Sequence, residues 1–285
     1  AKIPIVGNVF EAVEKNLFFP GRYAQYATSI NETAYSNGIG VTLAEIFSDG
    51  QFLYVSYIVE SDEPFKYTTI SIDERDGEII KKTQLGFEDA YSHVDFANKN
   101  LEVTGMSGLD GEFIDDNTFV GVQQYDLTSL NTTIPDEFVF KTKKIIIEND
   151  ANNIKDESLT KWGTWAFKVP VKVNKELSNV IEVEKINENG VGINTISLTP
   201  YTTIINATIK NYNRDEYFYE MNAYDNFGNQ LLYRSLKLIE EDKVKGIYTT
   251  TIDEMEEIRV VITRQASKLS DEGKEIILDT VISVN

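Results

Sequence analysis

Apolar and polar residues alternate along most of the chain after residue 39, with the period of two that is typical of half-buried β-strands. Every second residue from 39 to 43 is apolar, and residues 52–59 are almost continuously apolar. Between these runs stands Asp49-Gly50, a pair that favours a tight hairpin because such turns need positive φ. The pattern therefore predicts a long hairpin over 39–59. Asp76-Gly77 predicts a second hairpin, between 68–72 and 78–82.

The spacing before residue 39 predicts two short helices. Pro4 and Pro20 each open a segment, and proline is favoured in the first turn of a helix, where its missing N–H is not needed. Apolar residues then recur at helical spacing in the segment 3–15 and again from 23 to 34. Asn37-Gly38 ends the second helix, since both residues tolerate the left-handed conformation. One face of the first helix carries Val6, Val9, Phe10 and Val13.

Strand patterns return at 118–125, 137–148 and 162–173, and in the last of these Trp165 lies on the apolar side whereas Trp162 is expected to be more exposed. The stretch 86–117, rich in glycine, is assigned no regular structure. A polar segment at 174–179 precedes a fresh series of short strands. We therefore expect two domains, 1–175 and 176–285.

The second domain is predicted to be an immunoglobulin-like β-sandwich, because it offers seven or eight short strands at turn-marked spacing. The predicted fold class is mainly β: all-β with two short N-terminal helices, in two domains.

Three stretches within residues 3–61, IPIVGNVFEAV, YAQYATSIN and SNGIGVTLAEIFSDGQFLYVSYIVES, resemble the extracytoplasmic domain of unknown function of anti-sigma-factor-like, single-pass membrane proteins of Gram-positive bacteria. The segment GVGINTISLTPYTTIINATI resembles the start of a second domain of unknown function that often follows it. The resemblance implies a sensor or regulatory ectodomain on the extracytoplasmic face of the cell membrane. It also implies a spanning helix directly before Ala1 and a cytoplasmic part that holds a sigma factor.

The first predicted helix gains a role from this resemblance. Its apolar face, Val6, Val9, Phe10 and Val13, is too short to span a bilayer but suited to dock on the sheet that follows. It is therefore the candidate coupling segment between the membrane helix and the ectodomain. The alternative is a helix that only caps the core.

The formal net charge of −19, from 46 acidic and 27 basic residues, would repel phosphate backbones, so nucleic acid is not an expected partner. The compact basic run Lys141 to Lys144 alternates within an apolar pattern and is interpreted as a solvated strand face. The absence of cysteine excludes disulfides and thiolate chemistry. No apolar run approaches the roughly 20 residues that span a bilayer, so membrane contact is expected only through the upstream helix.

The sequence predicts no catalytic site and no cofactor. His93 is the single histidine, and on a strand it points away from its neighbour Ser92, so the two do not begin a Ser-His-Asp relay. One histidine without cysteine does not make a zinc site. The acids between Asp110 and Asp116 offer oxygen ligands for Ca²⁺, but they lack the spacing of the EF-hand loop, and solvated acids are the favoured interpretation.

The densest aromatic cluster spans residues 212–227. On a strand Tyr217 and Tyr219 would share one face and Phe218 the other, so part of the cluster belongs to a core. The candidate aromatic binding surface, for a sugar or a peptide, is Tyr212, Tyr217 and Tyr219.

The favoured function is thus a non-catalytic regulator that responds to an unidentified protein or wall ligand outside the cell. The alternative is a structural or adhesive cell-surface module that binds wall polymer or a protein. A carboxylate-dependent hydrolase ranks third.

Overall fold

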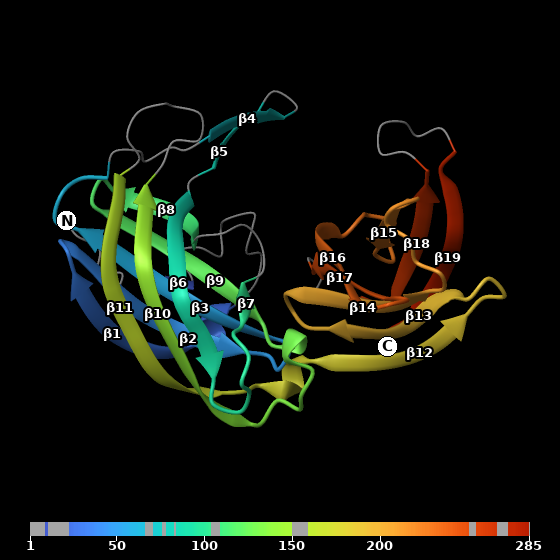
Figure 1. Ribbon diagram of the computed structural model, residues 1–285, viewed down its shortest axis with the longest axis horizontal. Coiled ribbons are helices and arrows are strands. Elements are labelled where there is room, and N and C mark those ends of the chain that lie inside the picture. Colours follow the sequence, from blue (N-terminus) through green and yellow to red (C-terminus); the bar gives the residue numbers. More distant parts are fainter. Residues whose placement is uncertain are drawn as a thin grey trace. The chain divides into compact units, whose positions relative to one another are not determined.

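The computed structural model describes residues 9–10, 23–65, 71–75, 78–82, 84–103, 109–149, 159–250, 255–266 and 273–284. The chain divides into two compact units, Ala1–Lys175 and Glu176–Asn285, and each has its own hydrophobic core. Strands dominate both units (Figure 1). The named helical elements among the described residues are short 3₁₀ turns, η1 (Tyr23–Gln25), η2 (Thr128–Leu130) and η3 (Lys175–Leu177), and Val9 and Phe10 are also helical. None of the described helices is long and apolar enough to cross a membrane.

One large antiparallel sheet forms most of the first unit, in the order β1-β2-β3-β9-β8-β6-β10-β11, with β7 paired to β9. A separate hairpin of β4 and β5 confirms the second predicted hairpin. The strands are β1 (Thr28–Ser36), β2 (Ile39–Ser48), β3 (Phe52–Ser61), β4 (Ser71–Arg75), β5 (Glu78–Lys82), β6 (Gln84–Val94), β7 (Glu102–Val103), β8 (Leu109–Asp115), β9 (Thr118–Asp126), β10 (Glu137–Asn149) and β11 (Leu159–Lys172).

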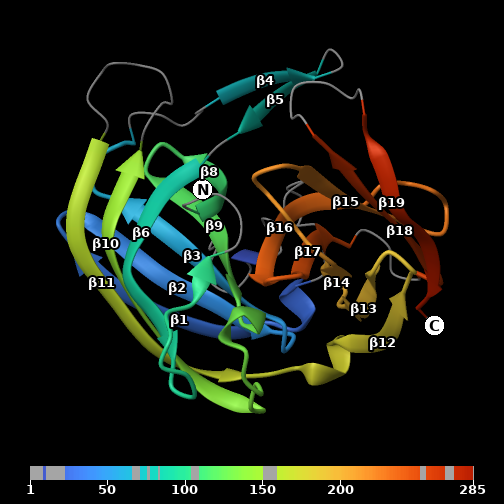
Figure 2. The ribbon, with the colours of Figure 1, turned by 45° about the vertical axis from the view of Figure 1, so that its right-hand side comes forward.

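The sheet of the first unit curls until its two outer strands meet (Figures 1 and 2). The Thr164 N–H on β11 donates to the Ser36 hydroxyl on β1 at 3.1 Å, and the Trp165 indole N–H donates to the Ile39 carbonyl at 2.9 Å. Trp165 is fully buried in the core that the curled sheet encloses, whereas Trp162 is 64% exposed. The predicted inward side of this strand is therefore confirmed.

The outer face of β2, β3 and β9 is also buried. Phe10 is fully buried, and its backbone N–H donates to the buried Glu45 carboxylate on β2 at 2.9 Å. The Tyr26 ring lies 5.9 Å from that of Phe47 on the same strand. Phe10 and Tyr26 thus lie on a second apolar layer, outside the main core. This layer consists of Ala44, Phe47, Phe52, Tyr54, Ile58, Val120 and Val122.

The prediction of two short N-terminal helices is wrong, because among the described residues the one named helical element before β1 is the 3₁₀ turn η1. The second predicted helix is replaced by η1 and by β1, which pairs with β2. Positions four apart, such as Ile30 and Ala34, share a face in a strand as well as in a helix, and both pack on the core. Pairing with β2 makes this segment a strand and not a helix. Of the first predicted helix only Val9 and Phe10 lie among the described residues, and both are in α-helical conformation.

The stretch 86–117, assigned no regular structure from the sequence, holds most of β6 and all of β8. The pattern is obscured because Asp89 and Ser92 are polar residues that face the interior, while Leu85 and Phe87 belong to the core. Inward polar residues remove the alternation by which a strand is recognised.

The second unit consists of two antiparallel sheets, in the orders β12-β13-β14-β17-β16 and β15-β18-β19. Buried residues of both sheets form one core, among them Ile193 and Ile205 of the first sheet and Met221 and Ile262 of the second. The unit is thus a two-layer sandwich. Its strands are β12 (Asn179–Ile186), β13 (Val191–Leu198), β14 (Thr202–Ile209), β15 (Phe218–Tyr224), β16 (Leu232–Glu240), β17 (Lys243–Thr249), β18 (Glu257–Gln265) and β19 (Glu275–Ser283).

Candidate functional site: an aromatic pocket in the second unit

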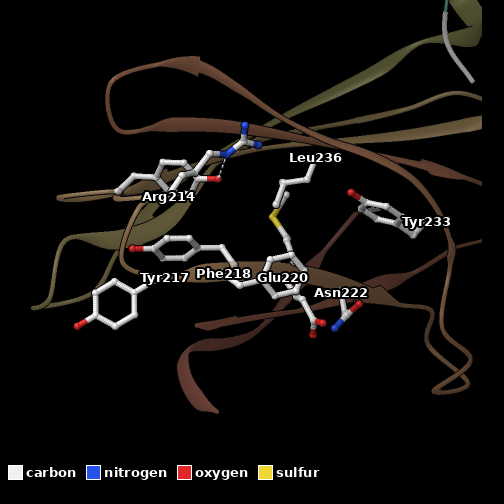
Figure 3. A pocket seen from close by; sticks show the side chains of 10 residues that line it. Arg214, Tyr217, Phe218, Glu220, Asn222, Tyr233 and Leu236 are labelled. Carbon is white, nitrogen blue, oxygen red and sulfur yellow. Dashed lines mark hydrogen bonds between the residues drawn. The ribbon is translucent and has the colours of Figure 1, made fainter. Parts of the chain in front are cut away.

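A pocket of about 550 Å³ lies where β15 and β16, the end strands of the two sheets, come together (Figure 3). This volume is typical of small-molecule sites, which are mostly apolar with a few polar groups. The loop after β14 contributes one wall, and β15 and β16 contribute the others. The lining residues are Tyr212, Arg214, Tyr217, Phe218, Tyr219, Glu220, Met221, Asn222, Tyr233 and Leu236.

The three tyrosines of the candidate aromatic surface come together in this pocket. Tyr212 and Tyr219 stack with ring centroids 4.4 Å apart, and Tyr217 meets Tyr219 edge to face at 6.2 Å. Tyr219 is only 6% exposed, and its hydroxyl accepts a hydrogen bond from the Asn213 N–H at 3.3 Å. Tyr219 therefore acts as the support, while the half-buried rings of Tyr212 and Tyr217 line the pocket.

Arg214 supplies the positive charge of the pocket. Its Nε–H donates to the Tyr212 hydroxyl at 3.0 Å, and its guanidinium carbon lies 5.9 Å from the centre of the Tyr212 ring. Partial burial raises the pKa of the Tyr233 hydroxyl, and the Arg214 charge opposes that rise. Figure 3 shows Arg214 and Tyr233 on opposite sides of the pocket. Among the described residues no carboxylate pairs with Arg214.

Two pairs of charged side chains lie near the pocket. Glu220 accepts a salt bridge from Lys274 at 2.7 Å. Arg264 lies 5.1 Å from the centre of the Tyr217 ring and is bound to Glu275 at 2.8 Å. These pairings offset Glu220 and Glu275, and Arg214 is the basic residue among those that line the pocket.

A close packing arrangement supports the pocket from below. The Tyr248 hydroxyl on β17 donates to the Met221 carbonyl on β15 at 2.7 Å and so joins the two sheets. A Cβ at Gly246 would lie 2.4 Å from the Met221 methyl and 2.7 Å from the Tyr248 hydroxyl. Glycine is required here because any side chain would displace one of these groups.

Sequence reasoning missed Arg214, Tyr233 and Leu236. Arg214 stands two residues after Tyr212, and this short separation in the sequence indicates that it lies near the tyrosine cluster. Tyr233 and Leu236 come from a strand that follows β15 by a turn, and their position depends on the fold of the sandwich.

The candidate coupling segment is described in part. Val9 and Phe10 are fully buried, and Phe10 is bound to Glu45. Val6 and Val13 lie outside the described residues.

The Ser92 and His93 side chains point to opposite faces of β6, as strand geometry predicts. The Ser92 hydroxyl shares a hydrogen bond with Thr142 at 2.8 Å inside the sheet. The His93 ring is half-buried and lies 5.2 Å from that of Tyr91. Asp95 accepts a hydrogen bond from the Val139 N–H at 2.9 Å. The three residues do not form a catalytic group.

A polar cluster lies inside the curled sheet of the first unit. The fully buried Lys144 ammonium on β10 donates to the Asp89 carboxylate, to the Gln123 side-chain oxygen at 2.6 Å and to the Tyr125 hydroxyl at 2.8 Å. Burial lowers the pKa of Lys144 to about 8, although the neighbouring Asp89 carboxylate opposes the change. The ammonium is enclosed on all sides by the core.

The prediction of a solvated face for the run Lys141 to Lys144 is wrong for its last member. Lys141 and Lys143 point outward, but Lys144 shares the inner face with Phe140. The Phe87 ring lies 4.8 Å from the ammonium and adds a cation–π contact. The strand period of two was the available signal, because it places Lys144 on the same side of the strand as Phe140.

Comparison with known proteins supports part of the family resemblance. Residues 1–61, which end with β3, match the family described as Domain of unknown function (DUF4179). The crystal structure of a conserved domain protein from Bacillus anthracis is similar, with a TM-score of 0.58 and 16% identity, over 96% of this chain and 95% of that chain. At this identity the likeness shows the fold alone.

A second structure, of manganese lipoxygenase of Gaeumannomyces graminis with part of zonadhesin of Komagataella pastoris, has a TM-score of 0.12 at 9% identity. It covers 83% of this chain and 89% of that chain, and so low a score carries no argument about the fold. No curated protein matches the chain.

Proposed function

We propose that the chain is a non-catalytic regulatory ectodomain on the outer face of a cell membrane, of the kind carried by anti-sigma-factor-like proteins. The match of residues 1–61 to a domain of unknown function supports this proposal. The observation that carries it is the contact between Phe10 and Glu45, which ties Phe10 to β2 of the sheet.

This contact would transmit a movement of Phe10 to strand β2. The Phe10 side chain is fully buried, and its N–H meets a carboxylate that is itself 3% exposed. Because both groups are buried, loss of this hydrogen bond carries a free-energy cost, so Phe10 is held at one place on the sheet. Packed interfaces of this kind switch between discrete arrangements.

The strand order of the second unit supports an immunoglobulin-like assignment. Without β12, the order β13-β14-β17-β16 opposite β15-β18-β19 corresponds to strands A-B-E-D and C-F-G of constant-type immunoglobulin domains. Sandwiches of this architecture are common in cell-surface proteins. The order therefore favours an extracytoplasmic location.

One observation favours the alternative of an adhesive surface module. Edge strand β16 exposes several large apolar side chains next to the pocket, and exposed apolar patches commonly mark interaction sites. Such a surface needs no coupling to the membrane. The residues are Leu232, Tyr233, Leu238 and Ile239.

The regulatory proposal is tested in cells that express the whole protein. Phe10→Ala should change output from the promoter of the partner sigma factor, because it loosens the docked segment. Val169→Ala is the matched control, since it truncates a buried residue of the same unit that faces the inner core. Both variants are compared at equal surface amounts. If neither Phe10→Ala nor deletion of the entire ectodomain changes promoter output, the adhesive module replaces the regulator.

A further inference from the structure

We infer that the aromatic pocket of the second unit binds an acidic saccharide, a sugar ring that carries a carboxylate. The inference rests on the proposal that this chain binds a ligand outside the cell, and it names the chemical class of that ligand.

The aromatic walls suit the faces of a sugar ring. Tyr212, Tyr217 and Tyr233 each present an apolar ring together with a hydroxyl that donates and accepts hydrogen bonds. A pyranose has the same division, with C–H groups on its faces and hydroxyls around its rim. The pocket volume of about 550 Å³ has room for a ligand of one to a few rings.

Arg214 specifies the carboxylate. Its Nε–H is used by the Tyr212 hydroxyl, which fixes the plane of the guanidinium and leaves its two terminal NH₂ groups for a ligand. A planar pair of donors matches the two oxygens of a carboxylate. On a chain with a net charge of −19 an anion needs such a local cation, and the nearby Glu220 is already offset by Lys274.

The edges of the sandwich disfavour an extended peptide, the other ligand that aromatic pockets commonly take. A peptide would add a strand along a free sheet edge. On β15 the Met221 carbonyl accepts from the Tyr248 hydroxyl, and the Ala223 carbonyl accepts from the Leu231 N–H at 2.8 Å. The pairing of β16 with β17 shifts register twice, near Tyr233 and near Leu238. Both edges are therefore protected, and a compact ligand fits better.

The test titrates three probes into the full chain by isothermal titration calorimetry: a galacturonic acid trimer, the neutral galactose trimer and a triglutamate peptide. We expect the acidic trimer to bind most tightly. Arg214→Gln should weaken its binding by about 10- to 100-fold, as for the loss of a charge-assisted hydrogen-bonded pair. The same variant should leave any binding of the neutral trimer unchanged.

Arg259→Gln is the matched control. Arg259 also lies over a tyrosine ring, 5.9 Å from the centre of Tyr224, but it is paired with Asp279 at 2.6 Å and does not line the pocket. This variant should bind the acidic trimer as the parent does, and circular dichroism should show both variants folded.

Equal binding of the neutral trimer, tighter binding of the peptide, or no binding of any probe would overturn the inference. Promoter output separates the two proposals. If Tyr217→Ala changes promoter output while no saccharide binds, the ligand class is wrong and the regulatory function stands. If the acidic trimer binds and ectodomain deletion leaves promoter output unchanged, the regulatory function is wrong and the saccharide site stands.

Discussion

Lys144→Met should destabilise the first unit and remove a characteristic dependence of its stability on pH. The Lys144 side chain is fully buried, and three polar groups accept hydrogen bonds from it. Methionine fills a similar volume but leaves the Asp89 carboxylate, 16% exposed, without its cation. Removing one partner of a buried ion pair costs about 3 to 5 kcal/mol, and the partial exposure of Asp89 favours the lower end.

The pH dependence follows from the lowered pKa of Lys144. The pKa is about 8 in the folded protein and 10.5 for a free lysine, so between these values the unfolded chain binds the proton more tightly. Stability from this group is therefore gained as pH rises from about 8 towards 10.5 and lost as pH falls back through this range, by roughly 1 to 2 kcal/mol between pH 7 and pH 9.5. Above pH 10 the gain reverses, because burial raises the pKa of Tyr57 and Tyr125 well above the ordinary value.

The assay is urea unfolding followed by tryptophan fluorescence. Both tryptophans, Trp162 and Trp165, belong to the first unit, so the signal reports this unit alone. Lys143→Met is the matched control on the outer face of the same strand, and it should change stability by less than about 0.5 kcal/mol. If Lys144→Met keeps the same rise in stability from pH 7 to pH 9.5 as the parent, the buried ammonium is not its source and the argument fails.

Three further predictions concern the cores and the pocket. Trp165→Ala should cost about 3 to 5 kcal/mol in urea unfolding and Trp162→Ala much less; equal small costs would contradict the burial of Trp165. Residues 176–285 expressed alone should melt cooperatively in calorimetry, since both sheets and their core lie within them, and aggregation would contradict this. Gly246→Ala should lower the melting temperature of this second unit by several degrees and weaken binding at the pocket, whereas an unchanged melting curve would show that Met221 and Tyr248 move aside freely.

The hairpin over 39–59 was predictable because its signals are local. Gly50 has a φ of 85°, and the Asp49 carboxylate accepts from the Gln51 and Phe52 N–H groups, each at 2.8 Å. The strand β1 was not predictable, since the spacing of Ile30 and Ala34 fits helix and strand equally. Its state is decided by pairing with β2, which is a contact beyond the local sequence.

The candidate site likewise has one part that the local sequence predicts and another that depends on distant contacts. Tyr212, Tyr217 and Tyr219 lie within eight residues, so a strand and its preceding loop bring them together without further information. Tyr233 joins them only through the order of the strands in the sandwich. Lys144 was misplaced because a buried charge depends on a partner, and Asp89 stands 55 residues away.

The closure of the curled sheet has a consequence for the order of events during synthesis. The indole N–H of Trp165 binds the carbonyl of Ile39, 126 residues earlier, and β3 pairs with β9 across 58 to 74 residues, from Glu60–Thr118 to Phe52–Asp126. Contacts this distant in sequence fold slowly, and at 5 to 20 residues per second the ribosome leaves the β2–β3 hairpin waiting for several seconds before β11 emerges. During that interval the inner apolar face of the hairpin lacks the cover of β11. We therefore expect the nascent first unit to bind chaperones that recognise apolar strands until residue 172 is free.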